Sequence, residues 1–142
     1  MISFVAYGVP APQGSMRAFN VKGRQHPVVT SDNPRTRPWK QTVLLAARDA
    51  LCDRAPIDIA VRVDVQFYMP RPKSAPKSRR LPTKLPDLDK LVRAILDAMT
   101  DAGVWHDDSQ VAMIQAAKFY AGGEGDVTPH GIPRAVIVVR LV

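Results

Sequence analysis

The sequence predicts a single α/β domain in which two main helices accompany a mixed β-sheet. The chain has 142 residues, which suits one domain, and 46% of them are hydrophobic, enough for an ordinary globular core. Segments with alternating apolar residues occur beside segments whose apolar residues recur at helical spacing, so both strands and helices are expected. Neither a repeat nor a linker divides the chain, and we therefore expect one domain over residues 1–142.

Strands and a first helix are expected in the first half of the chain. Residues 2–9 are apolar and partly alternating, which predicts a strand. Residues 10–38 contain many turn residues and five basic residues against one acid, with a short strand expected at residues 28–30. Residues 38–53 place apolar side chains on one helical face behind a proline, and Cys52 is expected to be a small core residue.

The second half should contain the best-defined strand and helix. Isoleucine and valine alternate with other residues over 57–69, which predicts a strand. Residues 70–86 hold six basic residues, five prolines and no acid, so we expect a basic, exposed and flexible loop there. One apolar stripe predicts a helix over 87–102. Two further strands are expected at 111–120 and 135–142, joined by a hairpin loop.

The charge balance indicates a polyanionic partner. The formal net charge is +7, which favours nucleic acid over an acidic membrane surface, although a soluble protein can also simply be basic. The single cysteine excludes a disulfide within the chain and a cysteine-based metal site. The N-terminal segment lacks the features of a signal peptide, and no run reaches the ~18 apolar residues of a membrane helix. We therefore expect a cytoplasmic protein with no membrane partner.

Acidic residues are concentrated in one short segment of this basic chain. Six of the 13 acids lie between positions 87 and 108. Because DNA repels carboxylates, such a cluster favours a role in binding a divalent cation such as Mg²⁺, which prefers carboxylate and phosphate oxygens. Asp87 and Asp89 open the expected helix and Arg93 follows one turn after Asp89. Asp108 is expected to open the next strand alongside this helix.

Each of these residues also has a purely structural explanation. Asp87 could cap the helix, which stabilises it by ~1 kcal/mol. Asp89 and Arg93 could form a surface pair worth a few tenths of a kcal/mol, and Asp107 and Asp108 could form a turn. A non-catalytic DNA-binding protein is therefore the alternative to an enzyme. The three histidines are scattered, which disfavours a histidine-based nuclease.

A dense pattern of acidic, small and aromatic residues covers the 26 residues from Pro86 to Val111. It consists of Asp87-Leu88-Asp89, Asp97-Ala98, Gly103, Trp105 and Asp107-Asp108-Ser109-Gln110. This pattern resembles the signature of the RusA family of Holliday junction resolvases, the crossover junction endodeoxyribonucleases. Lys118 also fits, ten positions after Asp108, and the GSMR run at residues 14–17 is similar to a basic loop near the start of such proteins.

The resemblance implies a RusA-like fold and a homodimeric endonuclease that uses Mg²⁺ or Mn²⁺ to resolve four-way DNA junctions by paired cuts. The family's three principal carboxylates match Asp87, Asp89 and Asp108, which are the expected metal ligands, and Asp107 is a further candidate behind them. Arg93 and Lys118 are the expected catalytic cations at the scissile phosphate. Arg93 stands where the family pattern has a lysine, and arginine can clamp phosphate but cannot readily act as a base.

Further basic residues are expected to bind flanking phosphates, which position DNA without reading its sequence. A flap or replication-fork nuclease of the same chemistry remains a second alternative. The resemblance also implies a bacterial source, with phages and prophages among the carriers of such genes. The expected DNA-binding residues are Arg17, Lys22, Arg24, Lys73, Lys77, Arg79, Arg80 and Lys84.

Overall fold

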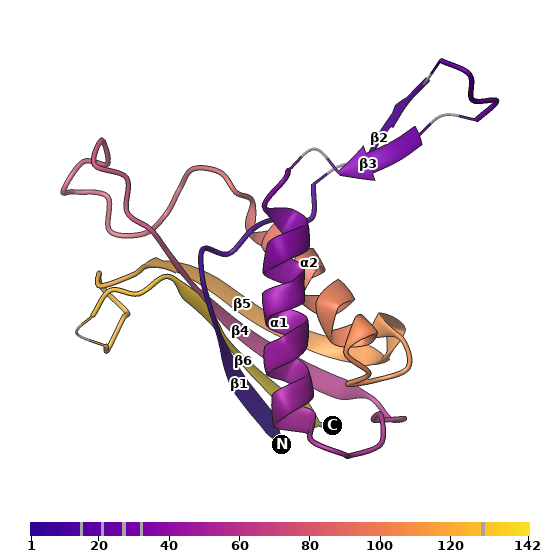
Figure 1. The fold of residues 1–142 in the computed structure, drawn as a ribbon. Helices are drawn as coiled ribbons and strands as arrows, with labels where there is room; N and C mark the ends of the chain where they lie inside the picture. Colours follow the sequence, from indigo (N-terminus) through magenta and orange to yellow (C-terminus); the bar gives the residue numbers. More distant parts are fainter. Residues whose placement is uncertain (15, 21, 27, 32, 129) are drawn as a thin grey trace.

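The computed structural model is a single-domain α/β arrangement in which two helices cover one face of a four-stranded sheet (Figure 1). It describes residues 1–14, 16–20, 22–26, 28–31, 33–128 and 130–142. The predicted fold class is confirmed. The elements are β1 (Ile2–Tyr7), β2 (Met16–Phe19), β3 (Val28–Ser31), α1 (Thr36–Leu51), β4 (Val61–Met69), α2 (Leu88–Asp101), the 3₁₀ turn η1 (Asp108–Gln110), β5 (Val111–Tyr120) and β6 (Arg134–Leu141).

The sheet is mixed, and its strand order is β1-β6-β4-β5. Strand β4 pairs in parallel with β5 and antiparallel with β6, while β1 pairs antiparallel with β6. Parallel neighbours need a crossover connection, and α2 supplies it between β4 and β5. The hairpin expected between β5 and β6 is therefore wrong, because β4 lies between them.

The core lies between the sheet and the two helices. One face of α2 is buried through Leu91, Ile95 and Met99, which confirms the apolar stripe predicted from the sequence. On the strand side, Val63 and Phe67 of β4 are fully buried beneath the helices. This packing turns the opposite face of α2, which carries the acidic residues, toward solvent.

Several local predictions are corrected by the structure. Strand β4 begins at Val61 rather than at 57, because the Ile57 amide donates to the Val104 carbonyl (2.9 Å) and the Gln110 side chain donates to the Ile57 carbonyl (2.8 Å). Cys52 is exposed at the C-terminal end of α1 and is not a core residue.

The N-terminal loop contains one more strand than expected. The short strand predicted at residues 28–30 is present as β3, and it pairs with β2 in a separate two-stranded hairpin. This hairpin projects beyond the end of α1 (Figure 1). Neither helix of the described residues is long and apolar enough to cross a membrane.

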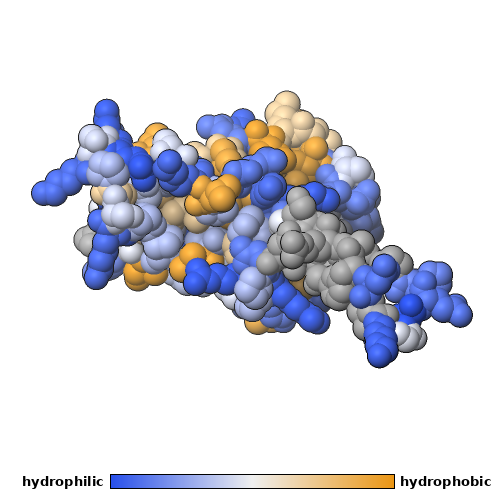
Figure 2. Space-filling view, turned by 90° about the horizontal axis from the view of Figure 1, so that it is seen from above, coloured by the Kyte–Doolittle hydropathy of each residue, from blue (hydrophilic) through white to orange (hydrophobic). Residues whose placement is uncertain are grey.

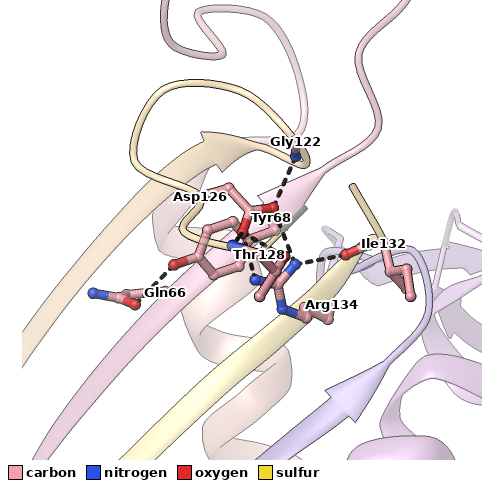
Figure 3. A network of polar contacts seen from close by, with 7 residues as sticks. All are labelled: Gln66, Tyr68, Gly122, Asp126, Thr128, Ile132 and Arg134. Carbon is pink, nitrogen blue, oxygen red and sulfur yellow. Dashed lines mark hydrogen bonds and ion pairs between the residues drawn. The ribbon is translucent and has the colours of Figure 1, made fainter. Parts of the chain in front are cut away.

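A buried ion pair fixes the connection between β5 and β6 (Figure 3). The side chains of Asp126 and Arg134 are 0% and 7% exposed, and their closest charged atoms are 2.7 Å apart. The Asp126 carboxylate also accepts hydrogen bonds from the Gly122 amide (2.8 Å) and from the amide and hydroxyl of Thr128 (2.9 and 2.7 Å). The Arg134 guanidinium lies 4.0 Å from the centroid of the Tyr68 ring. This network joins the turn to the end of the sheet.

Removing one partner of this pair should strongly destabilise the fold. Asp126→Ala leaves the Arg134 guanidinium buried without its counter-ion, so we expect a loss of about 3–5 kcal/mol in the free energy of unfolding. The matched control is Glu124→Ala, which removes an exposed ion pair with Arg80 and should change stability by less than ~1 kcal/mol. Urea denaturation at neutral pH compares the two variants, and equal stabilities would contradict a stabilising role for the buried pair.

The same pair predicts an acid-sensitive contribution to stability. Hydrogen bonds from Arg134 hold the pKa of Asp126 far below its usual range, with help from the Gly122 and Thr128 donors. A carboxyl whose pKa is lower in the folded protein stabilises the fold above its unfolded pKa of about 3.9, and this stabilisation is lost as the pH falls further. Wild-type protein should therefore lose more stability than Asp126→Asn between pH 5 and pH 3, as measured by urea denaturation.

Candidate active site

The first acidic residue, Asp87, lies at the start of α2, and its side chain does not cap the helix. Asp87 is the N-cap residue, as its position in the sequence predicted, but its carboxylate makes no capping hydrogen bond. The nearest cation is the Lys90 ammonium, at 3.7 Å, and the Asp87 side chain is 49% exposed. The structural explanation of Asp87 as a side-chain cap is therefore not supported, and its oxygens face solvent beside a cation.

Asp89 and Arg93 follow on the exposed side of the same helix. Both residues belong to the described part of the chain, and no ion pair within 4.0 Å joins them. A surface i,i+4 pair therefore does not account for these two residues. Their positions one turn apart place a carboxylate and a guanidinium on neighbouring parts of one solvent-facing surface.

The paired aspartates after α2 have different roles. Asp107 caps η1: its carboxylate accepts a hydrogen bond from the Ser109 hydroxyl (2.6 Å), and the Gln110 side chain accepts one from the Asp107 amide (3.2 Å). The Ser109 hydrogen bond lowers the pKa of Asp107. Asp107 thus has a structural function, whereas the next residue, Asp108, is exposed in the first position of η1.

Asp108 lies in a locally electronegative environment. Desolvation raises the pKa of its carboxyl, and the neighbouring charges of Asp107 and then Asp97 raise it further, while Arg93 lowers it. Asp108 is therefore close enough to α2 for charges on the exposed side of that helix to affect it. The prediction that Asp108 opens the next strand is wrong, because Asp108 begins η1 and β5 starts only at Val111. Additional positive charge at this point would stabilise the ionised form of Asp108.

The carboxylates do not form a closed metal cage. Across the described ranges, which include Asp87, Asp89 and Asp108, no group of three His, Cys, Asp or Glu side chains is arranged to hold a metal ion. Their chemistry nevertheless fits a hard divalent cation, because all three present exposed carboxylate oxygens. Mg²⁺ is commonly bound by only one or two carboxylates together with waters and substrate phosphates.

Lys118 connects β5 to the loop that precedes α2. Its ammonium donates hydrogen bonds to the carbonyls of Lys84 (3.2 Å) and Pro86 (2.9 Å), directly before Asp87. The side chain comes from the helix-covered face of the sheet and is partly buried. Lys118 thus positions the start of α2, and its expected contact with the scissile phosphate stays a prediction.

A cleft of about 540 Å³ opens beside Asp87. It lies between the segment that follows β1, the loop that follows β4 and the first turn of α2. Sequence reasoning missed Arg35, Lys90 and Tyr120 as parts of this surface, because no local pattern links segments so far apart in the chain. Lys84 and Lys118, which were predicted as functional residues, also line it.

The 70–86 loop is exposed and irregular, as predicted, but contacts of Arg71 and Arg80 hold it to the rest of the protein, in addition to the hydrogen bonds from Lys118. The Arg71 guanidinium donates to the carbonyls of Pro76 (2.6 Å) and Arg79 (2.9 Å) and lies 4.7 Å from the centroid of the Tyr120 ring. Arg80 is ion-paired with Glu124. The flexibility of the loop therefore remains a prediction, and Arg80 is the one predicted DNA-binding residue of this loop with a carboxylate partner among the residues described.

The other predicted DNA-binding residues are distributed over two loops. Lys73 and Lys77 are exposed in the 70–86 loop, and Lys22 and Arg24 are exposed between β2 and β3. Arg17 lies in β2, but its side chain, like Ser15 of the GSMR run, lies outside the described residues. From above, the molecule presents a largely hydrophilic surface that is interrupted by apolar patches (Figure 2).

A family model described as Endodeoxyribonuclease RusA matches residues 8–128. The chain belongs to the RusA family. Asp87, Asp89, Arg93, Asp108 and Lys118 all lie inside the matched range, and the resemblance predicted from the sequence is confirmed. A relative, the Uncharacterized protein YqaN of Bacillus subtilis (strain 168), is 32% identical over 130 residues, which cover 84% of this chain and 88% of that protein. RusA-family membership indicates a nuclease that acts on DNA junctions.

Proposed function

We propose that this RusA-family protein is a divalent-metal-dependent endodeoxyribonuclease that resolves four-way junctions by paired cuts. The observation that carries the proposal is the set of exposed carboxylates of Asp87, Asp89 and Asp108 on one acidic segment of a strongly basic protein. The Asp107 carboxylate caps η1, whereas the Asp87 carboxylate makes no capping hydrogen bond. We place the activity in the bacterial cytoplasm, where branched DNA arises.

Asp87, Asp89 and Asp108 are the residues that would hold the metal. When bound, Mg²⁺ or Mn²⁺ supplies an activated water and neutralises charge on the phosphate. The exposed carboxylates and the electronegative surroundings of Asp108 support this assignment. Substrate phosphate and water would complete the coordination shell, which explains why the protein alone need not form a cage.

The cations beside this cluster have two proposed tasks. Arg93 contacts the scissile phosphate and stabilises the negative charge that develops there. Lys118 positions the loop before Asp87 and reaches the same phosphate from the cleft. The basic residues of the two loops hold flanking phosphates and thereby fix the register of the DNA.

The role of Arg93 can be tested through its charge. We expect Arg93→Lys to keep much more cleavage activity than Arg93→Gln, because lysine retains the positive charge but not the fork of donors. Single-turnover cleavage of a synthetic junction measures the difference. Unchanged turnover in Arg93→Gln would show that Arg93 is a surface residue that takes no part in the reaction.

Two opposed cuts require two active sites, and we propose a homodimer to supply them. A two-fold axis would present the two sites to opposite strands of a junction with matching symmetry. In the described part of the chain, β5 is an edge strand of the sheet and exposes Met113 and Ile114. Unpaired strand edges of this kind can pair with another chain, which supports the proposal.

The substrate preference separates the proposal from its closest alternative. We expect cleavage of four-way junctions at lower protein concentration than cleavage of 5′ flaps, 3′ flaps or replication forks of the same arm sequence. A parallel titration of these four substrates in Mg²⁺ measures the preference. Equal or faster cleavage of a flap or fork would identify a nuclease of the same chemistry with another substrate.

A further inference from the structure

The cleft beside Asp87 has the size and composition of a ligand site. Its volume of about 540 Å³ lies within the range of pockets that take small molecules or parts of larger ones. One wall comes from the segment after β1 and the other from the loop after β4, so two segments distant in sequence enclose it. Its position next to a proposed metal ligand connects it with the cleaved strand.

The lining combines cations with flat apolar surface. Among the described residues that line the cleft, Asp87 is the one acid beside five basic residues, and this charge balance favours an anion. Prolines from both walls provide the apolar surface. The basic lining residues are Arg35, Arg79, Lys84, Lys90 and Lys118, and the prolines are Pro10, Pro12, Pro70, Pro72, Pro82 and Pro86.

An exposed leucine also lines this cleft. Leu85 is 83% exposed although it lies two residues before Asp87. Apolar side chains in this situation are used by DNA-binding proteins to contact or separate bases. Leu81 belongs to the same loop and is 46% exposed, but it does not line the cleft, so it provides a matched comparison.

Tyr120, the aromatic residue that lines the cleft, is poorly placed to stack on a base. Tyr120 is only 3% exposed, and the Arg71 guanidinium lies 4.7 Å from the centroid of its ring. It therefore offers little open surface for stacking. Apolar contact with a base must come from the prolines and from Leu85.

We propose that this cleft binds one unpaired nucleotide of the branched DNA, with its base against the proline wall and Leu85 and its phosphate among the lysines. A base enters such a pocket only after it has left its pair, and unpairing costs free energy that a junction with an unpaired base at the crossover does not incur. The protein should therefore select branched DNA in which a nucleotide at the crossover is already unpaired. This inference rests on the proposed function, because it concerns the substrate of the same site.

The test compares the affinity for two four-way junctions in EDTA. One is fully paired, and the other carries one unpaired thymine on each cleaved strand at the crossover. We expect wild-type protein to bind the second junction about tenfold more tightly, a difference of ~1.4 kcal/mol that lies within the range measured for single-base contacts. Leu85→Ala should lose most of this preference, because Leu85 lines the cleft, while Leu81→Ala should keep it. Both leucines are exposed and neither supports the core, so neither substitution should disturb the fold.

The outcomes are distinguishable from failure of the proposed function. Equal affinity for the two junctions, or an equal loss of affinity for both in Leu85→Ala, would overturn the nucleotide site while leaving junction cleavage intact. A wild-type protein that binds neither junction would instead overturn the proposed function itself. Fluorescence polarisation with labelled junctions gives both affinities without requiring cleavage.

Discussion

Replacing Asp87, Asp89 or Asp108 with asparagine is expected to reduce cleavage of a four-way junction by orders of magnitude. Each substitution removes a carboxylate that we propose as a metal ligand, and each carboxylate is exposed on the protein surface. Binding of the uncleaved junction should stay the same or improve, because a negative charge near phosphate is also removed. Single-turnover cleavage in Mg²⁺ and binding in EDTA measure the two effects separately.

Asp101→Asn is the control for these three variants. Asp101 is an exposed aspartate at the last position of α2, outside the proposed ligand set. The Asp101→Asn variant should cleave at the wild-type rate. This result would show that the loss of an aspartate from α2 does not by itself impair cleavage. If Asp87→Asn, Asp89→Asn or Asp108→Asn cleaves as fast as this control, that residue is not a metal ligand.

Neutralising the 70–86 loop is expected to weaken DNA binding and to flatten its dependence on salt. Replacing Lys73, Lys77, Arg79 and Arg80 by glutamine removes up to four phosphate contacts, and each contact contributes ~0.9 to the slope of log affinity against log salt. Arg80 is ion-paired with Glu124, so we expect three effective contacts and a slope that is shallower by about 2.7. Binding titrations between low and moderate salt provide the slope.

The control for the loop variant neutralises two basic residues far from the loop. Arg48 and Arg54 are exposed at the C-terminal end of α1, away from the 70–86 loop in Figure 1. Their replacement by glutamine should leave the salt slope unchanged. Cleavage by the loop variant should persist at saturating protein, because the loop contains none of the proposed ligands. An unaltered affinity and slope in the loop variant would move the DNA-binding surface to residues 17–40.

Local features of this protein were predictable because they depend on neighbouring residues. The apolar stripe of α2 predicted both the helix and the side that faces solvent, and the acids between 87 and 108 are recognisable as a group because they are close in sequence. The family resemblance favoured Asp108 over Asp107, but no local sequence pattern gave a physical reason for the difference. The structure gives this reason, because Ser109 and Gln110 complete a cap around Asp107 that leaves Asp108 outside it.

Features that depend on contacts between distant segments were missed. The alternation of residues 57–69 begins before β4 itself begins at Val61. The contacts of Ile57 with Val104 and Gln110 show that the first part of this segment lies outside the strand. The place of β4 between β5 and β6 follows from the crossover through α2, which no local pattern specifies. The cleft beside Asp87 was missed for the same reason, since its walls lie far apart in sequence.

The addition of Mg²⁺ to a preformed complex with a synthetic four-way junction tests the central claim most directly. The account predicts no cleavage in EDTA and, after Mg²⁺ is added, two symmetric cuts on opposed strands that leave 5′-phosphate and 3′-hydroxyl ends. Denaturing gels with each strand labelled in turn show the position and pairing of the cuts. A complex that stays intact in both Mg²⁺ and Mn²⁺ would contradict the account and identify a non-catalytic DNA-binding protein.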